Sequence, residues 1–207
     1  MNRVVPITLI TFALLAFATL LLVILPAIEI RDDPPTPGLL PYTAQEARGR
    51  AQYIAEGCVY CHSQQPRSSD QAPDTERGWG RPSVAADYAF DRPHLLGTMR
   101  SGPDLFNVGA RIPSAGWHLT HLYQPRAIYD WSLMPSYRYL FETKARAEPG
   151  DVIVSLPPQY RPSFGVVVAK PAARDLVAYL LSLKHDYPAP VNSVRDDGYS
   201  NEGGPQS

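Results

Sequence analysis

The longest apolar run in the chain lies at its N-terminus. From Val4 to Ile28 no residue is charged, and Leu, Ile, Val, Ala and Phe dominate. About 20 apolar residues in a helix are enough to cross the hydrocarbon core of a bilayer. A cleaved signal peptide is the alternative, but its apolar core is shorter, roughly 7 to 15 residues, and ends at a small-x-small site. This run is longer and leads into Pro26 and Glu29 without such a site, so residues 1–30 are predicted to form a retained transmembrane anchor.

The charges at the two ends of this run predict its orientation. Arg3 and the amino terminus precede it, whereas Glu29, Asp32 and Asp33 follow it around Arg31. Positive residues favour the cytoplasmic side of a membrane. The N-terminus is therefore expected in the cytoplasm and the rest of the chain outside it.

The sequence predicts a linker and then a helix after the anchor. Residues 31–43 contain Asp-Asp-Pro-Pro-Thr-Pro-Gly, which predicts a stiff, extended linker that lifts the next domain off the membrane. Thr43 and Glu46 then form a capping-box pattern, in which an N-cap threonine is followed three residues later by glutamate. The pattern predicts a helix from Ala44 to about Glu56, ended by Gly57.

Residues 44–186 are expected to form one domain of short helices and long loops. Residues 65–96 have no sustained periodicity, which predicts a long ordered loop that is functional or packed on something. Apolar residues at i, i+3, i+4 and i+7 predict the main C-terminal helix over 172–184. The other segments are predicted as short helices over 105–110 and 117–123, an irregular segment or small hairpin over 150–171, and a tail over 187–207. The predicted fold class is all-α.

Composition changes this picture in two ways. The formal net charge of −1 over 207 residues gives no support to nucleic-acid binding, which requires a basic surface. Proline is abundant, at 22 residues against 14 glycines, which favours ordered loops over long regular elements. One large cofactor would supply the core that such loops surround.

The two cysteines of the chain stand in the sequence Cys58-Val-Tyr-Cys61-His62. A disulfide across two intervening residues would close a very small loop and restrain little of the chain. A thioredoxin-like dithiol normally accompanies a βαβ pattern, and a zinc site would need further ligands at metal spacing. Attachment of a c-type haem uses all three residues: Cys58 and Cys61 as thioether links and His62 as the proximal iron ligand. One covalently bound haem c is therefore the predicted cofactor.

Electron transfer through such a haem needs a sixth iron ligand, for which methionine is the usual choice. Met1 is at the start of the apolar run, so Met99 and Met134 are the candidates. Met134 is favoured because it lies late in the domain and Pro135 would hold its loop rigid. The alternative role for Met99 is apolar packing near the haem or at a protein contact.

Other polar residues are candidates for supporting roles. The Pro103 carbonyl is predicted to accept the Nδ1 proton of His62 and fix the ring. Arg111 and Arg126 are predicted to bind haem propionates through charge-assisted hydrogen bonds. His118 and His121 are alternatives for that contact, and their i, i+3 spacing also permits a second metal site. No acid–base pair, nucleophile or phosphate-binding loop is evident, so no catalysis is expected of this chain alone.

Several stretches together resemble the monohaem subunit of cbb3-type cytochrome c oxidases. They run from the anchor to about Leu140: EGCVYCHSQQPR, YAFDRPHLLGTMRSGPDLFNVGAR, WHLTHLYQPRAI and SLMPSY. The resemblance implies a class I cytochrome c fold with haem ligands at positions matching His62 and Met134. It also implies a membrane complex whose catalytic subunit holds b-type haems and copper and reduces oxygen to water.

The expected function is therefore an electron relay in the bacterial inner (cytoplasmic) membrane, with the haem domain in the periplasm. Electrons would pass from a donor cytochrome c to the integral-membrane haem–copper catalytic subunit. The sequence differs from the family pattern over residues 67–89 and in the stretch DVIVSLPPQYRPSFGVVVAK. These differences leave the oxidase subtype and the electron donor open. Two alternatives remain: the small cytochrome c subunit of a nitric oxide reductase-like complex, and a free-standing anchored shuttle.

Overall fold

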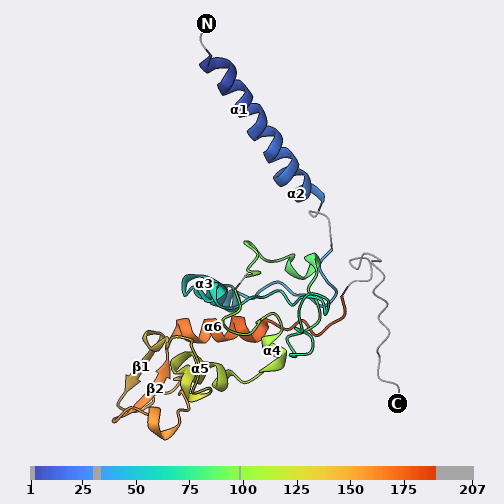
Figure 1. The fold of residues 1–207 in the computed structure, drawn as a ribbon. Helices are drawn as coiled ribbons and strands as arrows, with labels where there is room; N and C mark the ends of the chain where they lie inside the picture. The colour runs from blue at the N-terminus through green and yellow to red at the C-terminus, as the bar shows by residue number, and fades with distance from the viewer. Residues whose placement is uncertain (1–2, 30–33, 98, 190–207) are drawn as a thin grey trace, which may run out of the picture.

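A long apolar helix extends away from the rest of the chain in the computed structural model, which describes residues 3–29, 34–97 and 99–189 (Figure 1). The helix consists of α1 (Val4–Thr19), a π-helical turn (Leu20–Ile24) and α2 (Leu25–Glu29). Pro26 lacks the N–H that would bond four residues back, and the π turn lies just before it. None of its side chains is buried in the protein.

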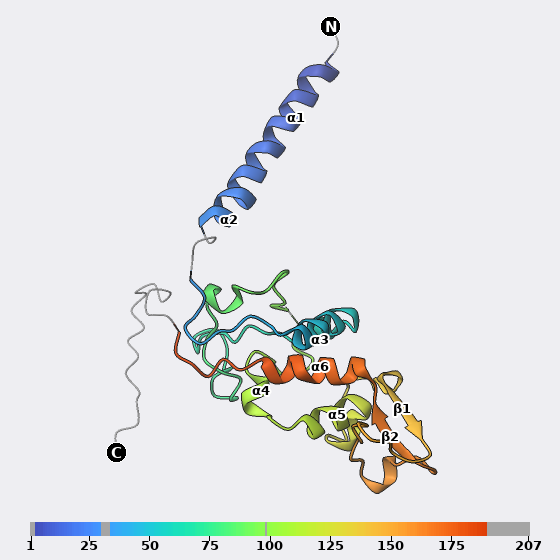
Figure 2. The same cartoon turned by 180° about the vertical axis from the view of Figure 1, so that it is seen from behind.

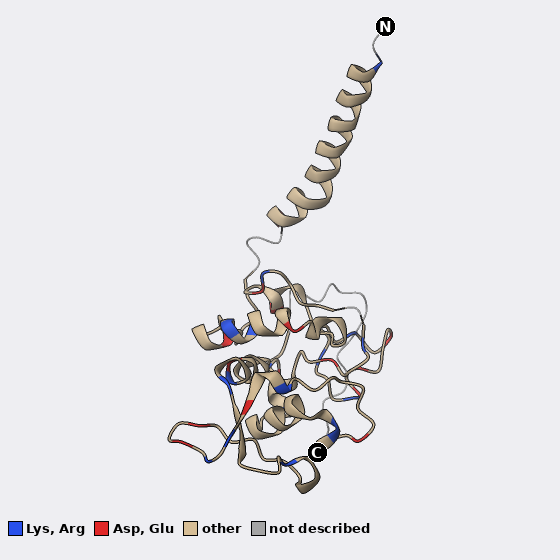
Figure 3. Ribbon diagram, turned by 90° about the vertical axis from the view of Figure 1, so that its left-hand side faces the viewer, with Lys and Arg blue, Asp and Glu red and all other residues tan. Residues whose placement is uncertain are grey.

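This helix has the length and composition of a membrane span. It is 26 residues long and contains an 18-residue stretch with a mean hydropathy of 2.7, and at 1.5 Å per residue it extends about 39 Å, more than the hydrocarbon core of a bilayer. Figure 3 shows it almost free of charged residues, whereas charges are scattered over the domain below it. The predicted apolar helix is confirmed.

Two helices that are distant in the sequence pack against each other in the domain (Figures 1 and 2). The first is α3 (Ala44–Ala55) and the second is α6 (Pro171–Ser182). The predicted capping box begins α3: Thr43 N donates to Glu46 Oε2 at 2.7 Å, and Glu46 N donates to Thr43 Oγ1 at 3.3 Å. Both helices agree with their predicted ranges to within two residues.

The close approach of α3 and α6 depends on Gly49. A Cβ at this position would lie 1.9 Å from the backbone oxygen of Asp175, so only glycine lets the two backbones come this near. The Tyr179 ring then packs edge-on against Tyr53 and Tyr42, at centroid distances of 5.4 and 5.6 Å. These contacts join α3, α6 and the segment before α3.

Two shorter helices lie between them in sequence. α4 (Val108–Arg111) starts later than predicted, because Phe106 N donates to the Asp104 carboxylate at 2.8 Å and the chain turns there instead. α5 (Ala115–Tyr123) contains the predicted helix and begins at Ser114, whose Oγ accepts from Trp117 N at 3.2 Å. The long loop over 65–96 is confirmed; it contains turns and one 3₁₀ turn (Ala85–Tyr88).

The prediction of an all-α domain is wrong in one region. β1 (Phe141–Lys144) and β2 (Val166–Ala169) pair antiparallel, with Phe141 opposite Ala169 and Lys144 opposite Val166. The β-branched side chains of residues 166–168 suit a strand, and Val167 and Val168 are buried. The small hairpin suggested within 150–171 is therefore wrong in its first strand, which lies at 141–144. Inside 150–171, Ile153 forms an isolated antiparallel bridge with Val168.

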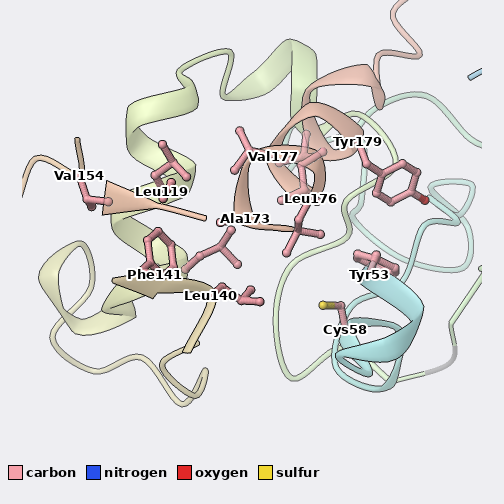
Figure 4. Close-up of a cluster of buried hydrophobic side chains, with 14 of the residues drawn as sticks. Tyr53, Cys58, Leu119, Leu140, Phe141, Val154, Ala173, Leu176, Val177 and Tyr179 are labelled. Atoms are coloured by element: carbon pink, nitrogen blue, oxygen red, sulfur yellow. The ribbon is translucent and has the colours of Figure 1, made fainter. Parts of the chain in front are cut away.

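Apolar side chains from both helices, from α5 and from the hairpin form one core (Figure 4). Cys58 belongs to this cluster and lies near Tyr53, at the end of α3. The core therefore reaches the Cys-x-x-Cys-His motif. The side chains labelled in Figure 4 are Tyr53, Cys58, Leu119, Leu140, Phe141, Val154, Ala173, Leu176, Val177 and Tyr179.

Part of the predicted linker packs on the domain. Thr36 is 1% exposed; its hydroxyl donates to Asp87 Oδ1 at 2.8 Å and its N–H donates to Ala86 O at 3.2 Å. Gly38 lies against the Tyr187 ring. The domain boundaries stay predictions, and most of the predicted tail lies outside the described residues.

Candidate functional site

The end of α3 delivers the two cysteines. Gly57 follows the helix with φ of +69°, the left-handed conformation that glycine adopts most easily. A 3₁₀ turn (Cys58–Tyr60) comes next, and His62 N donates to Cys58 O at 2.9 Å. Cys58 is buried and Cys61 is exposed, and the two thiols are free. Burial raises the pKa of the Cys58 thiol to about 12, because the thiolate is poorly solvated there.

The His62 ring has a defined tautomer. Its Nδ1 lies 2.8 Å from Pro103 O, the contact predicted from the sequence. A carbonyl only accepts, so Nδ1 carries the proton. Burial lowers the pKa of His62 and favours the neutral ring. Nε2 then keeps a lone pair, which is what a metal ligand requires.

Residues 102–105 pack alongside the segment that contains His62. Gly102 N donates to Cys61 O at 3.0 Å, and Leu105 N donates to Ser63 O at 2.8 Å, so residues 61–63 and 102–105 run together. A Cβ on Gly102 would lie 2.3 Å from His62 Cε1. The absence of a side chain at this position lets the backbone pack against the imidazole.

The two candidate methionines have different environments. Met134 is half-buried and packs against the core, whereas Met99 is 60% exposed. The loop that carries Met134 is tied to the end of α5 and the residues after it: Tyr137 N donates to Leu122 O at 2.9 Å, and Ser136 Oγ donates to Gln124 Oε1 at 2.6 Å. These bonds fix the chain directly after Pro135.

The two histidines of α5 differ in their partners. His118 Nε2 is 2.9 Å from Ile112 O, a contact that serves the fold. His121 stacks on Trp117 at 4.8 Å, and its buried Nδ1 has no hydrogen-bond partner among the described residues. Its pKa falls to about 4 because of burial and because His62 and His118 lie close enough to oppose a positive charge. No group of three or more His, Cys, Asp and Glu suited to a metal occurs in the described part of the chain, so nothing adds to the suggested second metal site.

The two arginines predicted to bind propionates are placed differently. Arg111 is half-buried and donates from Nη2 to Asp104 O at 3.0 Å; its charge also lowers the pKa of His62, so the two side chains are near each other. Arg126 is exposed, and its backbone oxygen accepts from Tyr160. Arg111 is brought to the His62 side of the domain, whereas no contact of Arg126 connects it to His62.

These residues fit a haem. Two free thiols stand with two residues between them, and a neutral imidazole presents a lone pair beside them. Among the described residues, the buried His121 Nδ1 lacks the partner that a buried polar atom normally has. A group outside the polypeptide, with polar substituents, would supply that partner. The combination of an apolar helix with a Cys-x-x-Cys-His site is typical of membrane-anchored c-type cytochromes.

The comparison with protein families agrees with this class. The family described as "Cytochrome C oxidase, mono-heme subunit/FixO" matches residues 2–154, and the chain belongs to it. The match includes the apolar helix, both cysteines, His62 and Met134. It also extends past Leu140 into the start of the stretch DVIVSLPPQYRPSFGVVVAK, whose sequence differs from the expected family pattern. No curated protein matches the chain. Family membership implies one haem and a catalytic partner subunit.

Several residues around His62 were not predicted from the sequence. Ser63, Arg100 and Asp104 form a buried polar group behind the ring. A carboxylate in a Gly-Pro-Asp sequence suggests a turn, and nothing in its local pattern shows that it is buried.

Proposed function

We propose that this chain is the electron-transfer subunit of a cbb3-type haem–copper oxidase in a bacterial cytoplasmic membrane. Family membership supports an oxidase subunit with one haem. The observation that carries the site is the His62 ring, which donates from Nδ1 to Pro103 O and so leaves Nε2 free to bind iron.

In this proposal Cys58 and Cys61 form thioether bonds to one haem c, and His62 and Met134 are its axial ligands. The bound haem supplies reversible one-electron chemistry at its iron. If both His62 and Met134 bound the iron, no coordination position would be left for oxygen. The chain carries electrons and the partner subunit reduces the substrate.

The surrounding residues fit the same function. We assign Arg111 and His121 to the haem propionates, since both lie near His62 and His121 Nδ1 has no partner among the described residues. Arg126, which is exposed, is assigned to them as well. We also assign the domain to the class I cytochrome c fold, on the crossing of α3 and α6 at Gly49 and on the position of the motif directly after α3.

The helix Val4–Glu29 supports the proposed topology. We place the N-terminus in the cytoplasm, on the basis of Arg3 before the span and Glu29 at its end, and the haem domain in the periplasm. Electrons arrive from a donor cytochrome c and leave toward the b haem of the integral-membrane catalytic subunit.

The proposal is tested by gentle purification of the full chain through a tag placed after Ser207. The expected result is a c-type spectrum, co-purified b-type haem, and oxygen uptake with reduced cytochrome c as donor. Co-purified b haem that reduces nitric oxide with little oxygen uptake would replace the oxidase with a nitric oxide reductase. A c-type spectrum without a partner would make the chain a free-standing shuttle, and no c-type spectrum would overturn the haem site itself.

A further inference from the structure

A single buried carboxylate fastens the two segments that meet at His62. Asp104 is 0% exposed. Its Oδ2 accepts from Ser63 Oγ at 2.5 Å and from Gln65 N at 2.8 Å, and its Oδ1 accepts from Phe106 N at 2.8 Å. Charge-assisted bonds of this kind are stronger than neutral ones, and a buried carboxylate needs them.

Arg100 completes the arrangement from the same side. Its Nε donates to Ser63 Oγ at 2.9 Å, and its Nη2 donates to Gln65 O at 2.8 Å. Its Nη1 donates to Asp74 Oδ1 at 2.8 Å, and Asp74 is also 0% exposed. The guanidinium therefore lies between two buried carboxylates and balances part of their charge.

The chain positions of these residues give the arrangement a specific consequence. Ser63 directly follows His62, and Asp104 directly follows Pro103. The Ser63–Asp104 bond is therefore one residue away, on both segments, from the bond between His62 Nδ1 and Pro103 O. A shift of Asp104 relative to Ser63 moves the Pro103 carbonyl relative to the ring.

We propose that Ser63, Arg100 and Asp104 form a clip that positions the Pro103 carbonyl against His62 and so tunes the reduction potential of the haem iron. These three are positioning residues, because none of them contacts the proposed ligand atom. The inference rests on the proposed function, since it requires His62 to bind haem iron. We name the three residues the Asp104 clip.

The direction of the effect follows from the chemistry of the ligand. A hydrogen bond donated by the far ring nitrogen makes a histidine a more basic ligand. A more basic ligand stabilises ferric iron and lowers the reduction potential, one of the means by which a protein adjusts it. Loosening the Asp104 clip is therefore expected to raise the potential.

The experiment is a potentiometric titration of the full haem-loaded chain in detergent, with four variants. Ser63→Ala removes one hydroxyl and no charge, Asp104→Glu keeps the charge but moves the carboxylate, and Asp104→Asn removes the charge and one acceptor oxygen. Asp151→Asn is the matched control, because Asp151 is also an ion-paired carboxylate, held by Lys144 beside the hairpin. A second readout is hydrogen exchange of the His62 Nδ1 proton, followed by NMR of the ferrous protein.

The expected potential is higher in all three clip variants and unchanged in Asp151→Asn. Asp104→Asn is expected to change the ferrous-to-ferric ratio about tenfold at a fixed potential, which is about 59 mV for one electron. Exchange of the His62 Nδ1 proton should be faster in Ser63→Ala and Asp104→Glu. An increase confined to Asp104→Asn would mean that only its charge acts and would overturn the positioning role. Unchanged potentials throughout would also overturn it, whereas a wild-type chain without a c-type spectrum would refute the haem site instead.

Discussion

The His62 ring is held by a carbonyl that lies 41 residues away in the sequence. Gly102 lies against the ring edge, and the Asp104 clip stands directly behind the two segments. The identity of the proposed ligand follows from its neighbours in the motif, but its tautomer follows from this distant contact. At the scale of the residue, the chemistry of the site depends on both.

The two methionines allow a matched test of the distal ligand. Met134→Leu removes the sulfur from a half-buried side chain, and Met99→Leu makes the same change at an exposed one. Because a thioether ligand favours ferrous iron, Met134→Leu is expected to lower the reduction potential by well over the about 59 mV of a tenfold change. Met99→Leu should leave the potential and the spectrum unaltered in the same titration. The reverse pattern would make Met99 the ligand.

At the scale of the element, the crossing of α3 and α6 organises the domain. The capping box begins α3 and proline begins α6, and both are local signals. The crossing point at Gly49 is not local, because the atom that excludes a side chain there belongs to Asp175. The position of the crossing also determines where the end of α3 presents Cys58.

A Gly→Ala pair tests this crossing. In Gly49→Ala the new methyl group would meet backbone at 1.9 Å, and such overpacking is expected to lower the free energy of unfolding by about 3 kcal/mol. Gly116→Ala is the control: its Cβ would meet only Ser114 Oγ at 3.9 Å, and in helix α5 it should stabilise by up to about 1 kcal/mol. Thermal unfolding of the full chain, followed by circular dichroism, measures both. Equal melting temperatures for the two variants would contradict a tight crossing.

At the scale of the whole molecule, the segment after the anchor and the segment after α6 meet on one side of the domain. Thr36 bonds to Asp87, and Asp87 pairs with Arg81 at 2.6 Å. Arg81 Nε donates to Tyr187 O at 2.8 Å. The segment that follows the apolar helix and the segment that follows α6 are thus joined through the Arg81–Asp87 ion pair.

His185 lies in this region and is expected to make the stability of the domain depend on pH. Its ring stacks on Phe106 at 3.9 Å, and Tyr187 Oη lies 2.8 Å from its Nδ1. Burial lowers its pKa to about 4, while the opposing charges of Asp87 and Arg81 have smaller effects. The unfolded chain takes up the proton near pH 6.5, so stability is complete above that pH and is lost as the pH falls toward 4, by at most about 3 kcal/mol.

The matching prediction compares His185→Phe with wild type between pH 7 and pH 4. The phenyl ring keeps the stacking but cannot be protonated. The free energy of unfolding of wild type should therefore fall relative to that of His185→Phe as the pH falls. His94→Gln, which replaces a histidine at an exposed position, is the control. Chemical denaturation at each pH measures the difference. A constant difference across this range would show that His185 does not titrate as described.

The sequence by itself determined the apolar span, the capped helix before the cysteines, the main C-terminal helix and the Cys-x-x-Cys-His motif. Each of these depends on residues within a few turns of one another, and their spacing is visible along the chain. The tertiary structure alone decided the β1–β2 pairing, the contact of Gly49 with Asp175, the burial of Thr36 and the Asp104 clip. Those features join residues that are distant in sequence, and whether a glycine is crowded or a carboxylate is buried depends on the segment that folds against it.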